Sequence, residues 1–287
     1  MAEVSNERTF PMTRTWFITG TSSGFGRLLT DRLLARGDRV AATVRRPQAL
    51  GDLKALHGDR LWIASLEMTD SDAIRATVDK AFGELGRIDV IVSNAGYGLF
   101  GAAEELEDSQ IRDLIDTNLV GSIQLIRAAL PHLRKQRGGR ILQVSSEGGQ
   151  MAYPGFSLYH ATKWGIEGFV ESVRQEVASF GIGLTLVEPG PTRTNFGASL
   201  VTSGSTDAYA NTPVGDLHRA FSEGSFDIKG DPGKMVEAMI ASVEQDPAPR
   251  RLTFGAAAYA SIRSALQGRL AELENRKEAA LAMDIDP

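Results

Sequence analysis

The sequence contains no cysteine among its 287 residues, and histidine is scarce. The absence of thiols excludes disulfide bonds, thiolate nucleophiles, iron–sulfur clusters and most structural zinc sites. No two histidines have the spacing that places two imidazoles on one face of a helix. The four are His57, His132, His160 and His218. We therefore expect no metal site.

Long apolar runs and blocks of one charge are also lacking. No apolar stretch approaches the roughly 18 residues that a membrane span requires, and residues 1–8 lack the apolar core of a signal peptide. Lys and Arg number 31 against 36 Asp and Glu, a formal net charge of −5. These features predict a cytoplasmic protein that binds neither nucleic acid nor a membrane.

Short apolar runs rich in β-branched residues alternate with longer segments of helical period. This alternation predicts an α/β fold, a Rossmann-like, doubly wound, parallel seven-stranded sheet with helices on both faces. The expected strands are 15–19, 39–44, 61–65, 88–93, 140–144, 184–187 and 251–254. The expected helices are 24–36, 47–57, 71–82, 109–137, 157–180 and 233–245.

The domain organisation follows from the same pattern. Residues 1–14 form a polar lead that we expect to be flexible, residues 15–255 a single domain, and residues 256–287 a long helical extension. Within the domain, the Gly- and Ser-rich segment 195–230 suits a substrate lid that carries three aromatic residues. These are Tyr209, Phe221 and Phe226.

The helical extension carries one apolar stripe at steps of three and four residues. Its members are Tyr259, Ile262, Leu266, Leu270 and Leu273. Such a stripe indicates packing of the helix against the domain, with a subunit contact as the alternative.

A glycine-rich turn, Thr19–Gly26, joins the first expected strand to the first expected helix. Glycines let backbone N–H groups approach a pyrophosphate, and the positive end of the following helix favours its negative charge. An ordinary strand-to-helix turn is the alternative interpretation. The position at the first strand–helix junction favours dinucleotide binding.

The end of the second strand indicates which dinucleotide is bound. Folds that use NAD carry an acidic residue there for the ribose 2′-hydroxyl, but this sequence has Arg45 and Arg46. A guanidinium suits a 2′-phosphate, so we expect NADP(H) rather than NAD(H). Two solvated arginines without a ligand are the alternative.

Tyr159 and Lys163 lie one helical turn apart, on the same face of the expected helix 157–180. A neighbouring ammonium stabilises a phenolate, so Lys163 is expected to lower the pKa of Tyr159 towards neutral pH. Ser146 follows the expected strand 140–144, at the sheet edge where such folds place ligands. Asn118 interrupts a helical pattern, which indicates a local polar role.

Taken together, these motifs resemble the short-chain dehydrogenase/reductase family, in its compact form of about 250 residues. The resemblance covers residues 15–194 and extends in strand order to residue 254. It implies that Tyr159 is the general acid/base, Ser146 orients the carbonyl and Lys163 holds the nicotinamide ribose. Asn118 would complete a proton relay.

The resemblance also implies which residues bind the cofactor. The glycine-turn members are Gly20, Ser22, Ser23, Gly24, Phe25 and Gly26, and Arg45 meets the 2′-phosphate. The remaining members are Glu67, Met68, Asn94, Ala95, Gly96, Tyr159, Lys163, Pro189, Gly190, Thr192 and Thr194. Two departures weaken the adenine pocket: Glu67 stands where the family has Asp, and Ser93 replaces the first Asn of its N-N-A-G.

The residues expected to line the substrate are largely apolar, and they indicate a hydrophobic ketone, aldehyde or alcohol. They are Phe100, Met151, Tyr153, Phe156 and Phe196. Glu147, next to Ser146, either faces solvent or contacts the substrate.

The sequence therefore predicts an NADP(H)-dependent oxidoreductase acting on CH–OH groups. An NAD-linked alcohol dehydrogenase and a non-catalytic dinucleotide-binding regulator are the alternatives. The resemblance implies a homodimer or homotetramer built on helices 109–137 and 157–180.

Overall fold

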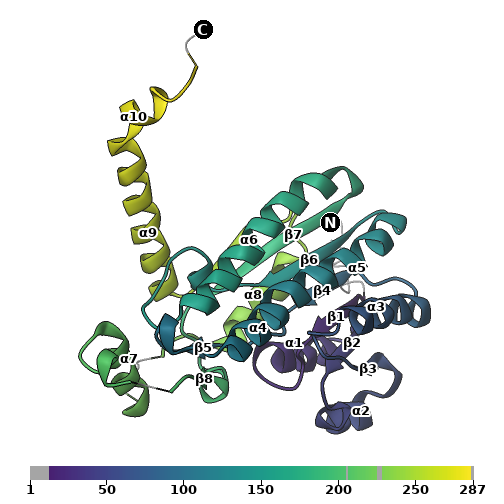
Figure 1. Ribbon diagram of the computed structural model, residues 1–287. Coiled ribbons are helices and arrows are strands. Elements are labelled where there is room, and N and C mark those ends of the chain that lie inside the picture. Colours follow the sequence, from purple (N-terminus) through teal and green to yellow (C-terminus); the bar gives the residue numbers. More distant parts are fainter. Residues whose placement is uncertain (1–12, 205, 225–227, 286–287) are drawn as a thin grey trace, which may run out of the picture.

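The computed structural model describes residues 13–204, 206–224 and 228–285 (Figure 1). Seven parallel strands form one sheet in the order β3-β2-β1-β4-β6-β7-β9. The strands are β1 Thr15–Thr19, β2 Arg39–Val44, β3 Leu61–Ser65, β4 Val90–Ser93, β6 Gly139–Val144, β7 Ile182–Pro189 and β9 Arg251–Phe254. The predicted α/β fold with its seven-stranded parallel sheet is confirmed.

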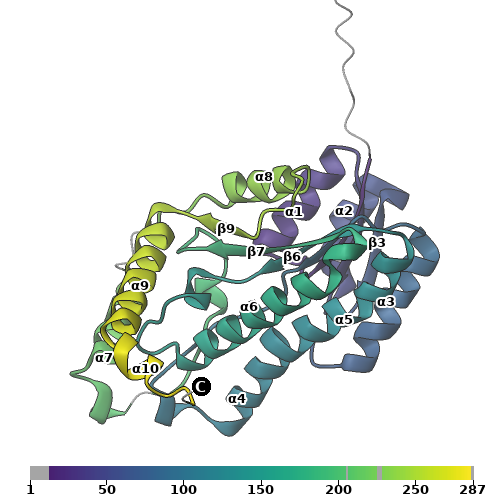
Figure 2. The ribbon, with the colours of Figure 1, turned by 90° about the horizontal axis from the view of Figure 1, so that it is seen from above.

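Helices cover both faces of the sheet, as Figure 2 shows from above. On one face lie α1 Gly24–Ala35, α2 Gly51–His57 and α8 Pro232–Ser242. On the other lie α3 Ser71–Leu85, α4 Asp108–Ile115, α5 Gly121–Lys135 and α6 Ser157–Val177. The side chains of successive strand residues alternate between the faces, so Phe17 joins one core cluster and its neighbours Trp16 and Ile18 join the other.

Two predicted helices are subdivided. The predicted helix 109–137 is confirmed as one helical stretch from Asp108 to Lys135, in which a π-helical segment, Asp116–Val120, joins α4 to α5. Asn118 lies in this segment, as its disruptive effect on the pattern suggested. The predicted helix 47–57 begins as a 3₁₀ turn, Pro47–Leu50, before α2.

The lid segment contains more regular structure than its composition predicted. A short strand, β8 Val201–Thr202, pairs in parallel with β5 Leu99–Phe100, and helix α7 Pro213–Ser222 follows. Phe226 lies outside the described residues. The same holds for residues 1–12 of the polar lead, so its expected flexibility stays a prediction, as do the domain boundaries.

The C-terminal extension forms α9 Ala256–Asn275 and α10 Lys277–Leu281, which project from the body of the molecule in Figure 1. The first turns of α9 pack on the domain, where Ala258 and Ile262 are buried, and further along the helix the Arg269 guanidinium lies 4.8 Å from the centre of the Trp164 ring on α6. The expectation that the whole stripe packs on the domain is wrong, since four of its members are exposed. They are Tyr259, Leu266, Leu270 and Leu273. Among the described residues, no helix is both long enough and apolar enough to cross a membrane.

Candidate active site

The site lies where β1, β4, β6 and β7 end. Because all four strands are parallel, their carboxyl ends meet at the same edge of the sheet. The turns that follow them carry the predicted glycine turn, Asn94, Ser146 and the Pro189–Thr194 segment. Helix α6 brings Tyr159 and Lys163 to the same edge.

The glycine turn has the geometry of an anion-binding cradle. Gly20 and Gly24 have φ values of +70° and +56°, in the left-handed region that favours glycine. A Cβ on Gly26 would lie 2.3 Å from the carbonyl oxygen of Gly20, so only glycine lets α1 approach the turn this closely. Ser23 precedes α1 without a side-chain capping bond, and the first turn carries no acidic residue, so its N–H groups suit a phosphate.

Asn94 fastens the glycine turn to the end of β4. Its amide Nδ2 donates to the carbonyl oxygens of Thr19 and Gly20, at 2.8 and 3.2 Å. The backbone N–H groups of Asn94 and Ala95 both donate to the Thr19 hydroxyl, at 3.0 and 3.1 Å. Asn94 and Ala95 therefore hold the shape of the turn, whereas Gly96 is exposed beside them.

Arg45 and Arg46 are exposed at the end of β2, on the flank of the glycine turn. The N–H groups of Gly20 and Thr21 donate to the carbonyl oxygen of Thr43, which places Arg45 two residues from this contact. Within the described part of the chain, neither guanidinium has a hydrogen-bond or ion-pair partner; the Ser65 hydroxyl donates only to the Arg45 carbonyl. Both cations are thus available to a ligand.

The residues expected at the adenine lie after β3. Glu67 is exposed, and its carboxylate accepts a 2.9 Å hydrogen bond from the N–H of Met68, which is buried. On the other side of the site, Gly190 donates to the carbonyl oxygen of Phe254 at 3.0 Å. The Thr192 hydroxyl donates to the Gly190 carbonyl at 2.7 Å, and Thr194 follows in the same turn.

The Ser146 side chain lies beside the Tyr159 phenol, close enough to lower its pKa. Burial has the larger effect and raises the pKa of Tyr159 to about 12, and the charge of Glu147 raises it further. The Ser146 hydroxyl also accepts a 3.1 Å bond from the N–H of Gly148. This pair can hold an oxygen atom between a phenol and a fixed hydroxyl.

Lys163 is buried one turn beyond Tyr159. Its ammonium donates to the carbonyl oxygen of Val144 at 3.1 Å and lies 5.6 Å from the centre of the Tyr159 ring. Burial lowers the pKa of Lys163 to about 8, against the opposing charge of Glu167. We expected Lys163 to lower the pKa of Tyr159, and this prediction is wrong for the structure described here. Burial of the phenol raises its pKa by more than the distant ammonium can lower it.

Asn118 lies in the π-helical segment beside the turn after β4. Its side chain accepts a 3.0 Å bond from the N–H of Tyr97 and donates to the Tyr97 carbonyl at 2.8 Å. A third contact, of 3.5 Å, reaches the Thr162 hydroxyl on α6. The Asn118 side chain therefore holds the backbone of Tyr97 in place. It does not reach Tyr159.

His160 has a structural role that the sequence did not reveal. Its Nδ1 is 2.8 Å from the Gly148 carbonyl, and its Nε2 accepts a 2.8 Å bond from the N–H of Tyr153. Since Nε2 is an acceptor, Nδ1 carries the proton and the imidazole is neutral. His160 therefore fastens both ends of the loop after Ser146 to α6.

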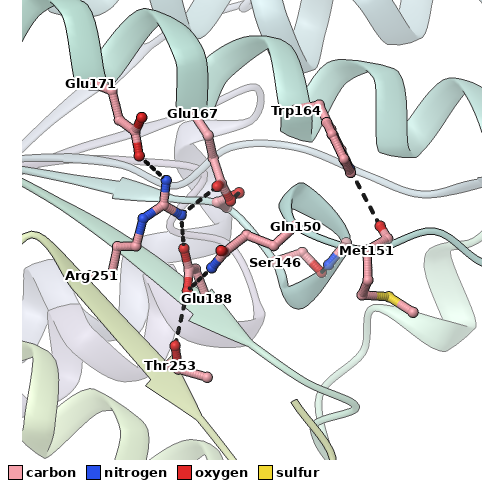
Figure 3. Close-up of polar contacts among 11 residues, drawn as sticks. Ser146, Gln150, Met151, Trp164, Glu167, Glu171, Glu188, Arg251 and Thr253 are labelled. Atoms are coloured by element: carbon pink, nitrogen blue, oxygen red, sulfur yellow. Dashed lines mark hydrogen bonds and ion pairs between the residues drawn. The ribbon is translucent and has the colours of Figure 1, made fainter. Parts of the chain in front are cut away.

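Arg251 is the second residue that the sequence did not single out (Figure 3). Its guanidinium binds the carboxylates of Glu167 and Glu171 on α6 and of Glu188 on β7. Glu167 accepts a 2.6 Å bond from the Ser145 hydroxyl, and Glu188 accepts a 2.9 Å bond from Gln150. Figure 3 shows how these contacts converge beside Ser146.

Two carboxylates in this network are deeply buried, since Glu167 is 4% exposed and Glu188 0%. Burial raises the pKa of Glu167, although its bonds from Ser145 and Arg251 lower it. A Cβ on Gly149 would lie 1.8 Å from the Glu167 carboxylate, so the loop after Ser146 packs directly on this network. The sequence did contain a signal for this network, because Glu167 and Glu171 follow Lys163 at steps of four and therefore share its face of the helix.

An aromatic cluster lies against Tyr159. The ring of Phe156 is 6.1 Å and that of Phe196 5.8 Å from the Tyr159 ring, between ring centres. Phe100 is buried beneath them, 5.2 Å from Phe156, and Phe221 of the lid helix α7 lies 5.2 Å from Phe100. The structure therefore brings together three of the five predicted substrate-lining residues, with Phe221 of α7 packed against Phe100.

The other two of the five lie at the loop after Ser146. Tyr153 is 37% exposed, with its ring 5.6 Å from that of His160, and the Met151 carbonyl accepts a 3.3 Å bond from Trp164. Among the described residues, no group of three or more His, Asp or Glu side chains has the arrangement of a metal site.

Comparison with known proteins places this geometry in context. A family model described as short chain dehydrogenase matches residues 14–203. Oxidoreductase BOA17 of Botryotinia fuckeliana (strain B05.10) is 35% identical over 273 residues, which cover 94% of this chain and 99% of that protein.

Solved structures show the same fold. A short-chain dehydrogenase from Streptomyces avermitilis superposes with a TM-score of 0.88 at 36% identity, over 96% of this chain and 99% of that one. The 3-ketoacyl-(acyl-carrier-protein) reductase from Brucella melitensis, complexed with NADH, superposes with a TM-score of 0.70 at 21% identity. That match covers 84% of this chain and 96% of the other.

Proposed function

The chain belongs to the short-chain dehydrogenase/reductase family of oxidoreductases, and on that premise we propose that it interconverts a hydrophobic ketone or aldehyde and its alcohol with NADP(H). The observation that carries this proposal is the placement of the Ser146 side chain beside the Tyr159 phenol, with Lys163 buried one turn away. A protein that only bound a dinucleotide would have no need of a phenol paired with a hydroxyl beside an aromatic cluster.

The residues of the glycine turn fit the pyrophosphate of a dinucleotide. Gly24 leaves open space where a Cβ would stand, and Ser23 gives the N–H groups at the start of α1 no side-chain cap among the described residues. Asn94 and Ala95 would support this cradle from below, and Thr192 and Thr194 would hold the nicotinamide end. When bound, the nicotinamide supplies or accepts the hydride.

Tyr159 moves the proton. Because its pKa is about 12, the phenol is protonated at neutral pH and is ready to donate to the oxygen of a carbonyl that is being reduced. Ser146 would donate to the same oxygen and stabilise its developing negative charge. Lys163 would bind the nicotinamide ribose, and the Asn118 segment would connect it to solvent in a proton relay.

The proposed preference for NADP(H) over NAD(H) rests on Arg45. This exposed cation has no partner among the described residues, and it stands two residues beyond the contact between β2 and the glycine turn. The fold alone does not decide between the cofactors, since the Brucella melitensis enzyme holds NADH. An NAD-linked alcohol dehydrogenase is therefore the second candidate.

The apolar character of the substrate rests on Phe156 and Phe196, whose rings lie against Tyr159. The homodimer or homotetramer built on the α4–α5 and α6 helices remains a prediction from the family resemblance. The cytoplasmic location likewise remains a prediction from the sequence.

The test is to titrate the protein with NADPH and NADH by fluorescence. Absorbance at the reduced nicotinamide band is then followed with a panel of hydrophobic ketones, aldehydes and quinones. Tight NADPH binding with turnover supports the proposal, and tighter NADH binding favours the second candidate. Binding without turnover on the whole panel favours a regulator, and no binding of either cofactor contradicts the proposal altogether.

A further inference from the structure

Glu147 is a buried acid directly after Ser146. It lies in the short 3₁₀ turn Glu147–Gly149 that follows β6, and only 3% of its surface is exposed. The structure thus contradicts the interpretation of Glu147 as a solvent-facing side chain. The other interpretation, contact with a substrate, remains to be argued from its surroundings.

The two oxygens of this carboxylate are in different situations. Oε1 accepts a 2.6 Å hydrogen bond from the hydroxyl of Tyr153. Oε2 is buried and has no hydrogen-bond partner in the described part of the chain. No lysine or arginine of the described residues forms an ion pair with Glu147 either, in contrast to Glu167 and Glu188, which share Arg251.

An unpartnered buried carboxylate oxygen is costly. Removing such a group from water without a compensating bond destabilises the fold, and proteins rarely leave one so unless a ligand, an ion or an ordered water pairs with it. Burial accordingly raises the pKa of Glu147, and only the bond from Tyr153 lowers it. The free acceptor therefore calls for a donor from outside the chain.

The position of Glu147 places that donor close to the reacting carbon. Its neighbour Ser146 lies beside Tyr159, and the charge of Glu147 is near enough to raise the pKa of the Tyr159 phenol. Tyr153, more than a third exposed, connects Glu147 with the open side of the site. The Ser261 side chain on α9 is close enough to lower the pKa of Tyr153, so the C-terminal helix lies beside this residue.

We propose that Glu147 and Tyr153 form a specificity subsite for a hydrogen-bond-donating group of the substrate, a hydroxyl or an ammonium close to the carbonyl. This inference rests on the proposed function. The donor group binds the Glu147 carboxylate, while the aromatic cluster of Phe100, Phe156 and Phe196 takes the apolar part of the same molecule. The substrate is therefore an apolar ketone that carries one polar donor near its reacting end.

A matched series of ketones tests the subsite: propiophenone, 3-hydroxypropiophenone and 3-(dimethylamino)propiophenone in its ammonium form. We expect kcat/KM for the two donor-bearing ketones to exceed that for propiophenone by about tenfold or more. Intrinsic reactivity differs within the series, so the decisive quantity is the change of this ratio between variants.

Three variants separate charge from hydrogen bonding. Glu147→Met removes the acceptor, and both preferences fall by about tenfold. Glu147→Gln keeps an acceptor oxygen without charge, so the hydroxyl preference is retained more than the ammonium preference. Glu272→Gln, exposed on α9, is the control and leaves both ratios unchanged. NADPH binding and circular dichroism confirm that each variant folds.

Binding of the same ketones to the NADPH complex, measured by calorimetry, keeps the test independent of turnover. If the ketones bind with the expected ratio but none is reduced, the subsite stands and the proposed reaction fails. If turnover occurs and Glu147→Met leaves every ratio unchanged, the subsite is wrong and the proposed reaction stands. Equal binding of all three ketones to the wild-type protein also overturns the subsite.

Discussion

Ser145 donates a 2.6 Å hydrogen bond to Glu167, a residue exactly one helical step of four beyond Lys163 on α6. Through this bond, the strand end that precedes Ser146 is held by the helix that carries Tyr159 and Lys163. The other oxygen of the Glu167 carboxylate binds Arg251, which extends the contact to the last strand of the sheet. The relative position of serine and phenol thus depends on side chains that do not themselves touch the reacting atoms.

Arg251→Met is expected to lower the free energy of unfolding by about 3 kcal/mol, because it leaves the buried Glu188 and Glu167 carboxylates without their cation. Arg251→Lys keeps the charge but lacks the planar fork with which the guanidinium reaches its carboxylates, so its free energy of unfolding should lie between those of the wild type and Arg251→Met. Urea denaturation measures both. Arg250→Met, at an exposed neighbouring position, is the control and should change stability by less than about 0.5 kcal/mol. An equal loss of stability in Arg250→Met would contradict the assignment of this stabilisation to the Arg251 network.

Tyr159→Phe should lower turnover by roughly 100-fold or more, because it removes the proton donor and leaves the cofactor cradle intact. NADPH affinity, measured by fluorescence titration, should remain within about twofold of the wild-type value. Undiminished turnover would show that another group supplies the proton.

The two reaction directions should depend differently on pH. Tyr159, with a pKa of about 12, is protonated throughout the range from pH 6 to 9, so its role as proton donor in reduction does not change there. Oxidation needs the phenolate, whose fraction rises about tenfold per pH unit below the pKa. Initial rates at saturating substrates should therefore rise with pH for oxidation only. A rate of oxidation that is flat from pH 6 to 9 would mean that substrate and cofactor lower this pKa strongly.

Arg45→Asp should weaken NADPH binding by about tenfold or more and shift the preference towards NADH, since a carboxylate repels a 2′-phosphate and accepts a bond from a 2′-hydroxyl. Competition between the two cofactors, monitored by fluorescence, measures the ratio of their dissociation constants. Arg276→Asp on the exposed tail is the charge-matched control. A ratio unaffected by the Arg45 variant would place the 2′-phosphate elsewhere.

His160 should make the fold sensitive to acid. Burial lowers its pKa, and protonation of Nε2 would break the bond from the Tyr153 N–H. The unfolded chain takes up this proton near pH 6.5 and the folded chain only at lower pH, so the stabilisation is complete above about pH 6.5 and declines as the pH falls.

The variant His160→Gln tests this dependence, because glutamine can accept from Tyr153 and donate to Gly148 without titrating. Denaturation at pH 7.5 and pH 5 should show a smaller acid loss in this variant than in the wild type. His57→Gln, in α2, is the control. Equal acid loss in wild type and His160→Gln would exclude this imidazole as the cause.

Much of the fold could be predicted from the sequence, because the information is local. The strands Thr15–Thr19 and Arg39–Val44 are short β-branched runs bounded by turns, and their predicted ends match the structure. Three of the four predicted catalytic residues stand just past the end of a strand or on one helix, so spacing and strand order suffice to bring Ser146, Tyr159 and Lys163 together.

The rest depends on contacts between distant segments. Arg251 is 84 residues from Glu167 and 63 from Glu188, and no local pattern marks it. His160 sits inside the Tyr159–Lys163 motif, yet its two partners lie in a loop whose path the sequence does not specify. The apolar stripe on α9 shows another limit of prediction from sequence. Periodicity predicts which residues share a face of the helix, but it does not predict what covers that face.

The network around Arg251 has a consequence for the order in which the enzyme acquires its abilities during synthesis. The glycine turn, Asn94 and β2 all lie within the first hundred residues, whereas Arg251 is among the last strand residues to leave the ribosome. We expect a nascent chain to assemble its dinucleotide cradle well before the serine loop settles. The capacity to bind would then precede the capacity to react, and chemical competence would arrive only with the final strand.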